Sequence, residues 1–229
     1  MPNLKLKKSA LVIGATGMVG KELVKQLQAS NHYHTIIIVV RRQQPMEADS
    51  RIKFVQVEDF DHLATHAEDL RANHIYCCLG STIKKAGSKK SFEKIDWKYP
   101  VKLAQLSQAY DGFESYLIIT AMGANPLSAI FYNRVKGNCE KELMSMSLPR
   151  LKIFRPSLLL GVREEFRFGE KIGTYVIKFL TIIFKFFGKK MLLAIPGAVV
   201  ATSMINIAQI NAEGCDILEP DAIFKSAGL

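Results

Sequence analysis

Three glycines at three-residue intervals, in the stretch "SALVIGATGMVGKELV" (residues 9–24), constrain the fold of this chain most strongly. The apolar run before Gly14 predicts a short buried strand, and the apolar residues after Gly17 recur at the spacing of a helix. A glycine turn between a strand and a helix lets a diphosphate approach bare backbone amides at the helix N-terminus, where the partial positive charge favours an anion. The stretch therefore predicts the opening of a dinucleotide-binding unit.

The length and the order of the apolar runs predict one α/β unit. The 229 residues fit a single domain, and a hydrophobic content of 48% is ample for its core. Strand-like runs alternate with helical segments, which predicts a doubly wound parallel sheet with ligands at the carboxyl ends of the strands. Beyond residue 156 the alternation breaks. We therefore expect residues 1–229 to form one nucleotide-binding domain, in which residues 156–229 contribute a small cap on the substrate side.

Hydrophobic periodicity also sets approximate limits for the elements. Strands are predicted near residues 10–14, 35–40, 52–57, 74–79, 115–120 and 151–154. Helices are predicted near residues 18–29, 61–70, 92–110, 130–146, 171–187 and 200–212.

Charge and cysteine usage argue against several classes of function. The net charge is +10, which could favour nucleic-acid binding. No basic cluster is interleaved with aromatic residues as in a nucleic-acid recognition module, however, and this argues against nucleic acid as a partner. The densest basic run, "IKKAGSKK" (residues 83–90), is interpreted first as a solvated loop. The four cysteines have neither disulfide nor zinc spacing, and His62 and His66 have no third ligand nearby, so no metal is expected. The cysteine usage predicts a reducing, cytoplasmic location.

The segment "KIGTYVIKFLTIIFKFFGKK" (residues 171–190) combines a wide apolar face with a stripe of lysines and threonines. Lysines in the middle of the segment argue against a membrane-spanning helix and favour an amphipathic one. We expect it to roof a hydrophobic pocket, so that the substrate carries an apolar tail. A protein partner, a homodimer interface or a peripheral membrane contact would use the same face.

Two arginines, Arg41 and Arg42, end the second predicted strand. An acidic residue at this place accepts the ribose hydroxyls of NAD, whereas arginines suit the additional 2′-phosphate of NADP. Gly80 follows the fourth predicted strand, where a glycine lets the backbone pass close under a nucleotide. The pattern favours NADP(H) as the cofactor.

Tyr132 and Lys136 are the best candidates for chemistry. Their spacing of four places both on one face of the helix that follows the fifth strand. An ammonium group beside a phenol stabilises the phenolate and lowers the pKa of the tyrosine, which can then exchange a proton with a substrate oxygen. Thr120 ends the fifth strand, where its hydroxyl can donate a hydrogen bond to the same oxygen.

Taken in order, "GATGMVG", "CCLGST", "YNRVKG" and "FRPSLLLG" resemble segments of the short-chain dehydrogenase/reductase superfamily, and in particular of its atypical branch with the Tat-interacting-protein oxidoreductases. The resemblance implies a Rossmann-type fold, bound NADP(H) and a catalytic set of Thr120, Tyr132 and Lys136. The cofactor contacts that it implies are Gly14, Thr16, Gly17, Met18, Val19, Arg41, Arg42, Leu79, Gly80, Lys136 and Arg155.

Two departures from the superfamily pattern keep two functions open. Threonine replaces the usual serine, and the asparagine that completes the catalytic tetrad elsewhere has no counterpart except Asp96 in "FEKIDWKYP". The first hypothesis is an NADPH-dependent reductase of a small-molecule carbonyl compound, with Tyr132 as the proton donor. The second is a redox sensor or assembly protein that binds NADP(H) and a protein partner without turnover.

Overall fold

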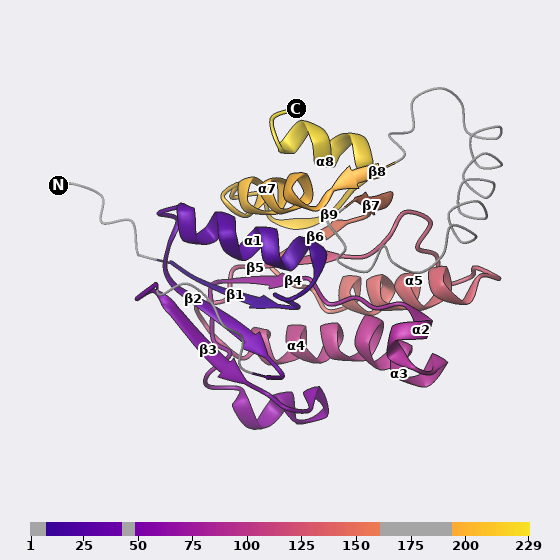
Figure 1. Ribbon diagram of the computed structural model, residues 1–229, viewed down its shortest axis with the longest axis horizontal. Helices are drawn as coiled ribbons and strands as arrows, with labels where there is room; N and C mark the ends of the chain where they lie inside the picture. Colours follow the sequence, from indigo (N-terminus) through magenta and orange to yellow (C-terminus); the bar gives the residue numbers. More distant parts are fainter. Residues whose placement is uncertain (1–7, 43–48, 161–193) are drawn as a thin grey trace, which may run out of the picture.

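A parallel sheet of seven strands forms the middle layer of the molecule (Figure 1). The computed structural model describes residues 8–42, 49–160 and 194–229. The strands lie in the order β3-β2-β1-β4-β5-β6-β9, and every neighbouring pair is parallel. Their limits are β1 Lys8–Ile13, β2 Tyr33–Val40, β3 Ile52–Gln56, β4 His74–Cys77, β5 Ser115–Ile119, β6 Arg150–Phe154 and β9 Gly214–Leu218. The predicted Rossmann-type α/β fold is confirmed.

Helices cover both faces of this sheet (Figure 1). One face carries α1 (Met18–Ala29), α7 (Gly197–Ala208) and α8 (Pro220–Ser226), and the other carries α4 (Tyr99–Gln108) and α5 (Phe131–Met144). The shorter elements are a 3₁₀ helix at Phe60–His66, α2 at Ile83–Ala86, α3 at Lys89–Glu93 and a π-helical turn at Lys94–Lys98, with a separate parallel pair of β7 (Leu158–Leu160) and β8 (Ala194–Pro196).

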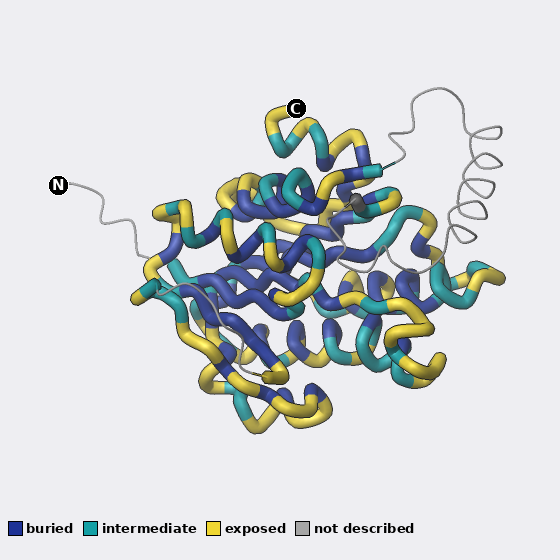
Figure 2. Tube along the Cα trace, in the orientation of Figure 1, coloured by how far each residue is buried: buried dark blue, intermediate teal, exposed yellow. Residues whose placement is uncertain are grey.

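The alternation of side chains along each strand divides the core into two halves. On β1, Leu11 and Ile13 pack toward α4 and α5, whereas Ala10 and Val12 pack toward α1 and α7. All four are fully buried, and the central strands form the buried middle of the molecule (Figure 2). Because both faces are covered, the central strands are largely continuous apolar runs, which makes them recognisable in the sequence.

The C-terminal part of the chain joins the main layers. Of the segment 156–229, in which a substrate-side cap is expected, β9 pairs with β6 and α7 packs against α1. The rest of that expectation concerns residues 161–193, and it lies outside the described residues together with the predicted amphipathic helix at 171–190. Within the described ranges, no helix is long and apolar enough to cross a membrane.

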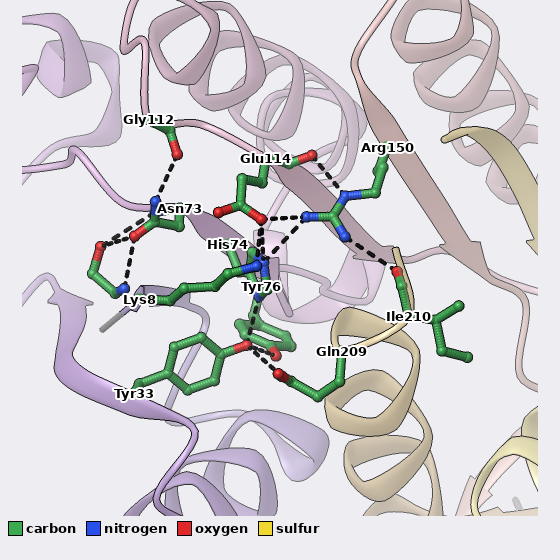
Figure 3. A network of polar contacts seen from close by, with 11 residues as sticks. Lys8, Tyr33, Asn73, His74, Tyr76, Gly112, Glu114, Arg150, Gln209 and Ile210 are labelled. Carbon is green, nitrogen blue, oxygen red and sulfur yellow. Dashed lines mark hydrogen bonds and ion pairs between the residues drawn. The ribbon is translucent and has the colours of Figure 1, made fainter. Parts of the chain in front are cut away.

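A buried polar network closes the amino edge of the sheet (Figure 3). The Tyr33 hydroxyl lies 2.7 Å from His74 Nδ1 and 2.6 Å from the Tyr76 hydroxyl. Glu114 Oε2 accepts a hydrogen bond from Arg150 Nη2 at 2.6 Å and lies 3.4 Å from His74 Nε2. Burial lowers the pKa of His74 to about 4, so the ring is neutral and Nδ1 can accept a hydrogen bond from the Tyr33 hydroxyl. This network fastens the ends of four strands on the side away from the glycine turn.

Candidate active site

The first strand leads into a tight turn that requires glycine. Gly14 has a φ of +82°, and a side chain there would place its Cβ 2.5 Å from the carbonyl carbon of Cys78. The Gly17 amide donates to the Gly14 carbonyl at 3.0 Å and closes the turn. The β1–α1 turn is therefore pressed against the end of β4, at the carboxyl edge of the sheet.

The N-terminus of α1 leaves backbone donors free for an anion. Its N-cap is Gly17, which has no side chain to accept from the first-turn amides, and the first turn has no acidic residue. Thr16 and Gly17 are exposed, whereas Val19 is buried under the helix. This combination of bare amides and positive helix dipole fits a diphosphate, as the sequence predicts.

The other predicted cofactor residues lie after neighbouring strands of the same edge. Arg41 and Arg42 follow β2 directly, and both are exposed. Leu79 is buried and Gly80 is exposed just after β4. Because β2, β1 and β4 are adjacent and parallel, their ends bring the arginines, the glycine turn and Gly80 to one side of the sheet.

Lys136 is held by an ion pair with Asp96. Its ammonium nitrogen lies 2.8 Å from Asp96 Oδ1, and the two side chains are 5% and 0% exposed. Burial alone would lower the pKa of Lys136, but its interactions with Asp96 and Tyr132 together outweigh burial, and the pKa lies above its usual range. The other carboxylate oxygen, Oδ2, accepts from the Ser81 amide at 2.9 Å. The cation is thus fixed at the end of β4.

Asp96 Oδ1 is buried and makes no well-aligned hydrogen bond, in spite of the short distance to Lys136. A Cβ at Gly80 would lie 3.6 Å from that oxygen and 3.8 Å from the Lys136 nitrogen. The missing side chain of Gly80 therefore leaves room above the pair. A ligand hydroxyl placed there would satisfy Oδ1, which fits the sugar of a bound nucleotide.

Tyr132 is placed by the packing of α5. Gly137, one residue after Lys136, touches the β5–α5 loop so closely that a Cβ would lie 2.2 Å from the Asn125 carbonyl carbon. The half-buried Tyr132 ring lies 5.6 Å, between centroids, from the fully buried ring of Phe92. Tyr132 and Lys136 are one helical turn apart on α5 and interact electrostatically.

Thr120 and Arg155 lie in a different set of contacts. The Thr120 hydroxyl donates to Glu140 Oε1 at 2.6 Å, and the same buried carboxylate accepts from Arg155 Nε at 3.0 Å. Arg155 also donates to Glu219 at 3.1 Å. Thr120 is 5% exposed, and its hydroxyl donates its hydrogen bond inside the protein, to Glu140, and not toward Tyr132. The structure thus brings Tyr132 and Lys136 together, and it ties Thr120 and Arg155 to Glu140.

The sequence does not predict the contacts of three site residues. It indicates Asp96 only as a replacement for an asparagine, and it does not single out Phe92 or Glu140. Glu140 does carry a signal, since it continues the four-residue spacing of Tyr132 and Lys136 on one face of a helix. An acidic residue on a buried face requires a partner, which here is Arg155.

The comparisons with known proteins identify the family. Residues 10–124 match the model of the "NAD dependent epimerase/dehydratase family". The chain belongs to this family. The matched segment covers the glycine turn, the arginines after β2, Gly80, Asp96 and Thr120. In the described part of the chain, no group of three histidine, cysteine or acidic side chains is placed to hold a metal ion.

Two curated relatives connect the family to the branch that the motifs resemble. Protein HTATIP2 of Rattus norvegicus is 33% identical over 165 residues, which cover 71% of this chain and 67% of the relative. Protein FMP52-1, mitochondrial, of Scheffersomyces stipitis is 31% identical, with 96% of this chain and 95% of the relative covered. Several yeast relatives are named mitochondrial, which contradicts the expected cytoplasmic location. Cysteine usage reports redox conditions and does not distinguish the compartments that share them.

Solved structures share the fold at low sequence identity. The oxidoreductase ylbE of Lactococcus lactis superposes with a TM-score of 0.67 at 18% identity, and the match covers 96% of this chain and 95% of that one. The enzyme WbmG of Bordetella bronchiseptica, solved in complex with NAD, has a TM-score of 0.63 at 12% identity and covers 96% of this chain and 74% of its own.

Proposed function

We propose that the protein is an NADP(H)-dependent oxidoreductase that reduces a carbonyl compound, with Tyr132 as the general acid. The observation that carries this proposal is the position of Tyr132 and Lys136. They share one face of α5 at the carboxyl edge, and the lysine lies beside Gly80 in an ion pair with Asp96. A phenol next to a buried cation, close to the place where a nucleotide sugar fits, suits proton transfer to a substrate oxygen.

The cofactor residues follow from the chemistry of each part of a dinucleotide. The first-turn amides of α1 would bind the diphosphate, with Thr16 to Val19 around it. Arg41 and Arg42 would pair with the 2′-phosphate, and this is the basis for NADP(H) over NAD(H). Leu79 and Gly80 would line the path of the sugar, and Lys136 with Asp96 would bind its hydroxyls. When bound, the reduced nicotinamide supplies the hydride for the carbonyl carbon.

The chain's own residues then handle the proton. Tyr132 gives its phenolic proton to the carbonyl oxygen as negative charge develops there. The Lys136 ammonium stabilises the phenolate that remains, and Asp96 keeps that ammonium in place. General acid catalysis of this kind contributes roughly 10²–10⁴-fold to a rate.

Thr120 has a different role in this proposal from the one the sequence suggests. Its hydroxyl donates a hydrogen bond to Glu140, so this hydroxyl is not available as a donor to the substrate oxygen. We assign Thr120, Glu140 and Arg155 to a network that joins α5 to the ends of β5 and β6. Thr120 and Arg155 would then position Tyr132 through the helix, without contact with the substrate or the cofactor.

The same engagement of Thr120 favours a second candidate function. A hydroxyl held by Glu140 and a carboxylate in place of an asparagine would also suit a protein that binds NADP(H), changes with its redox state and does not turn over. The sensor and the enzyme share the cofactor site and differ in whether hydride leaves it.

Titration with NADPH and NADH, followed by NADPH oxidation over a panel of aldehydes, ketones and quinones, tests the proposal. We expect tighter binding of NADPH and turnover of at least one carbonyl class. Tight NADPH binding without turnover on any member would favour the sensor. Equal affinity for the two cofactors would remove the role given to Arg41 and Arg42.

A further inference from the structure

Exposed lysines gather on α2 and α3, directly after Gly80 in the sequence. Between residues 81 and 95 the chain has five lysines and a single acidic residue, Glu93. Three of these lysines, together with one arginine of α5, form what we call the cationic rim: Lys84, Lys89, Lys90 and Arg134. The three lysines are exposed, and Arg134 is half-buried.

Ring contacts place two members of the cationic rim, Lys89 and Arg134, beside the residue that precedes Tyr132. The Lys89 ammonium lies 5.2 Å from the centre of the Phe131 ring, and the Arg134 guanidinium carbon lies 5.7 Å from it. Phe131 directly precedes Tyr132, and the buried Phe92 ring of α3 packs against both. These contacts place Lys89 and Arg134 next to the helix end that carries the proposed acid.

The charges of the cationic rim have no acidic partner in the part of the chain that the structure describes. Its neighbours Lys94 and Lys98 pair with Asp61 and Glu142, respectively. Among the residues that the structure describes, no acidic side chain pairs with the rim lysines, and Arg134 donates only to backbone carbonyls, at 2.7 Å and 3.3 Å. Unpaired cations that share one surface add their potentials and attract anions.

We propose that the cationic rim selects a substrate with an anionic group, a carboxylate or a phosphate, carried by the same molecule as the carbonyl. This rests on the proposed function, since it assigns the substrate class of the same site. The anion would lie over Lys84, Lys89 and Lys90 while the carbonyl oxygen reaches Tyr132. Charge attraction of this kind raises association rates by roughly 10- to 10³-fold and falls with ionic strength.

Two aldehydes of one skeleton test the proposal, 4-carboxybenzaldehyde and its neutral methyl ester. We expect the wild type to reduce the carboxylate with a kcat/KM about tenfold higher than the ester at low salt. This preference should disappear at about 1 M salt, where the Debye length is about 3 Å. Equal kcat/KM values for the two aldehydes at low salt would overturn the proposal and leave the proposed function standing.

A matched pair of variants locates the effect. K89Q/K90Q should lower the carboxylate-to-ester ratio about tenfold, whereas K141Q/K225Q, on exposed lysines of α5 and α8 with the same change in net charge, should leave it at the wild-type value. An equal fall in both variants would show that overall charge is responsible and would contradict a local site.

If neither aldehyde is reduced, binding decides about the rim, while NADPH oxidation over the full panel of aldehydes, ketones and quinones decides about the proposed function. Calorimetry with 4-carboxybenzaldehyde should then show salt-sensitive binding to the NADP-loaded wild type that K89Q/K90Q loses and K141Q/K225Q keeps. Unchanged binding in K89Q/K90Q would overturn the inference. So would retention of the wild type on phosphatidylserine vesicles, lost in K89Q/K90Q, together with no preference between the aldehydes, since the rim would then bind a membrane surface.

Discussion

Mild acid should destabilise the fold through His74, because the native state holds this ring neutral inside the amino-edge network. The side chain is fully buried, and its Nδ1 lies 2.7 Å from the Tyr33 hydroxyl (Figure 3). Burial is the main reason that the pKa of His74 falls from 6.5 to about 4, and the charge of Lys8 lowers it further. The Glu114 carboxylate opposes the shift without cancelling it.

The difference between the two pKa values sets the size of the effect. In the unfolded chain His74 takes up a proton below about pH 6.5, whereas the native ring resists protonation down to about pH 4. The unfolded state therefore binds more protons in this window. The stability that His74 gives is complete above the window and is lost as the pH falls through it. At about 1.4 kcal/mol for each pH unit, the loss reaches about 3 kcal/mol. A loss of this size is a large part of the 5–15 kcal/mol that a domain has.

Urea denaturation followed by circular dichroism, at several pH values across the window, measures this loss. The free energy of unfolding of the wild type should fall by about 3 kcal/mol between neutral pH and about pH 4. His74→Gln, which cannot titrate, should show a much smaller slope, and His62→Gln, at an exposed position, should keep the wild-type slope. An unchanged slope in His74→Gln would refute the reasoning.

Three further sets of substitutions test the site itself. Gly17→Val should abolish binding of NADPH and NADH in calorimetry, because its side chain would block the approach of a diphosphate to the amides. The far-UV circular dichroism should be unchanged, since the nearest atom to its Cβ, the carbonyl oxygen of the residue that begins the turn, is 3.2 Å away, a tight contact that a small local shift relieves. Normal binding would place the cofactor elsewhere. Replacement of Arg41 and Arg42 by alanine should weaken NADPH binding by a few kcal/mol, at about 1.5–3 for each charged hydrogen bond, and should leave NADH binding as it was. Asp96→Leu should lower the free energy of unfolding in urea by about 3–5 kcal/mol, because Lys136 would remain buried without a counter-charge, and adding Lys136→Met should restore much of the loss. A double variant as unstable as the sum of the single ones would contradict this.

The sequence predicts the first six strands of the sheet and most helices of the alternating part, because buried parallel strands are continuous apolar runs. It misses β9, whose segment "GCDIL" is largely exposed at the edge of the sheet. The strand is held by its backbone ladder with β6 and by the contact of Lys152 with Asp216, at 2.5 Å. These contacts join residues more than 60 positions apart, so no local pattern shows them.

One predicted helix, at residues 92–110, is divided in the structure. A π-helical turn at Lys94–Lys98 separates α3 from α4, and Asp96 lies on this turn. The wider turn changes the phase of the side chains on its two sides, which the periodicity of apolar residues is too coarse to resolve. The position of Asp96 against Lys136 follows from this local change, so the ion pair was not predictable from spacing.

The cofactor edge of the site was predictable and its partners were not. The glycine turn, the arginines after β2 and Gly80 are adjacent to predicted strand ends, and parallel topology brings such ends together. The hydrogen-bond partner of the Thr120 hydroxyl depends on which side chain the fold brings next to it inside the protein. Glu140, which lies on α5, accepts a hydrogen bond from this hydroxyl at 2.6 Å, whereas the sequence predicts that the hydroxyl donates to a substrate oxygen.

A comparison of the wild type with Tyr132→Phe in steady-state NADPH oxidation tests the central claim most directly. The variant lacks only the phenolic hydroxyl, and its ring can still pack on Phe92. We predict that kcat falls by about 10²- to 10⁴-fold on a carbonyl that the wild type reduces, while the dissociation constant for NADPH stays the same. A variant that reduces the same carbonyl at the wild-type rate would contradict the account.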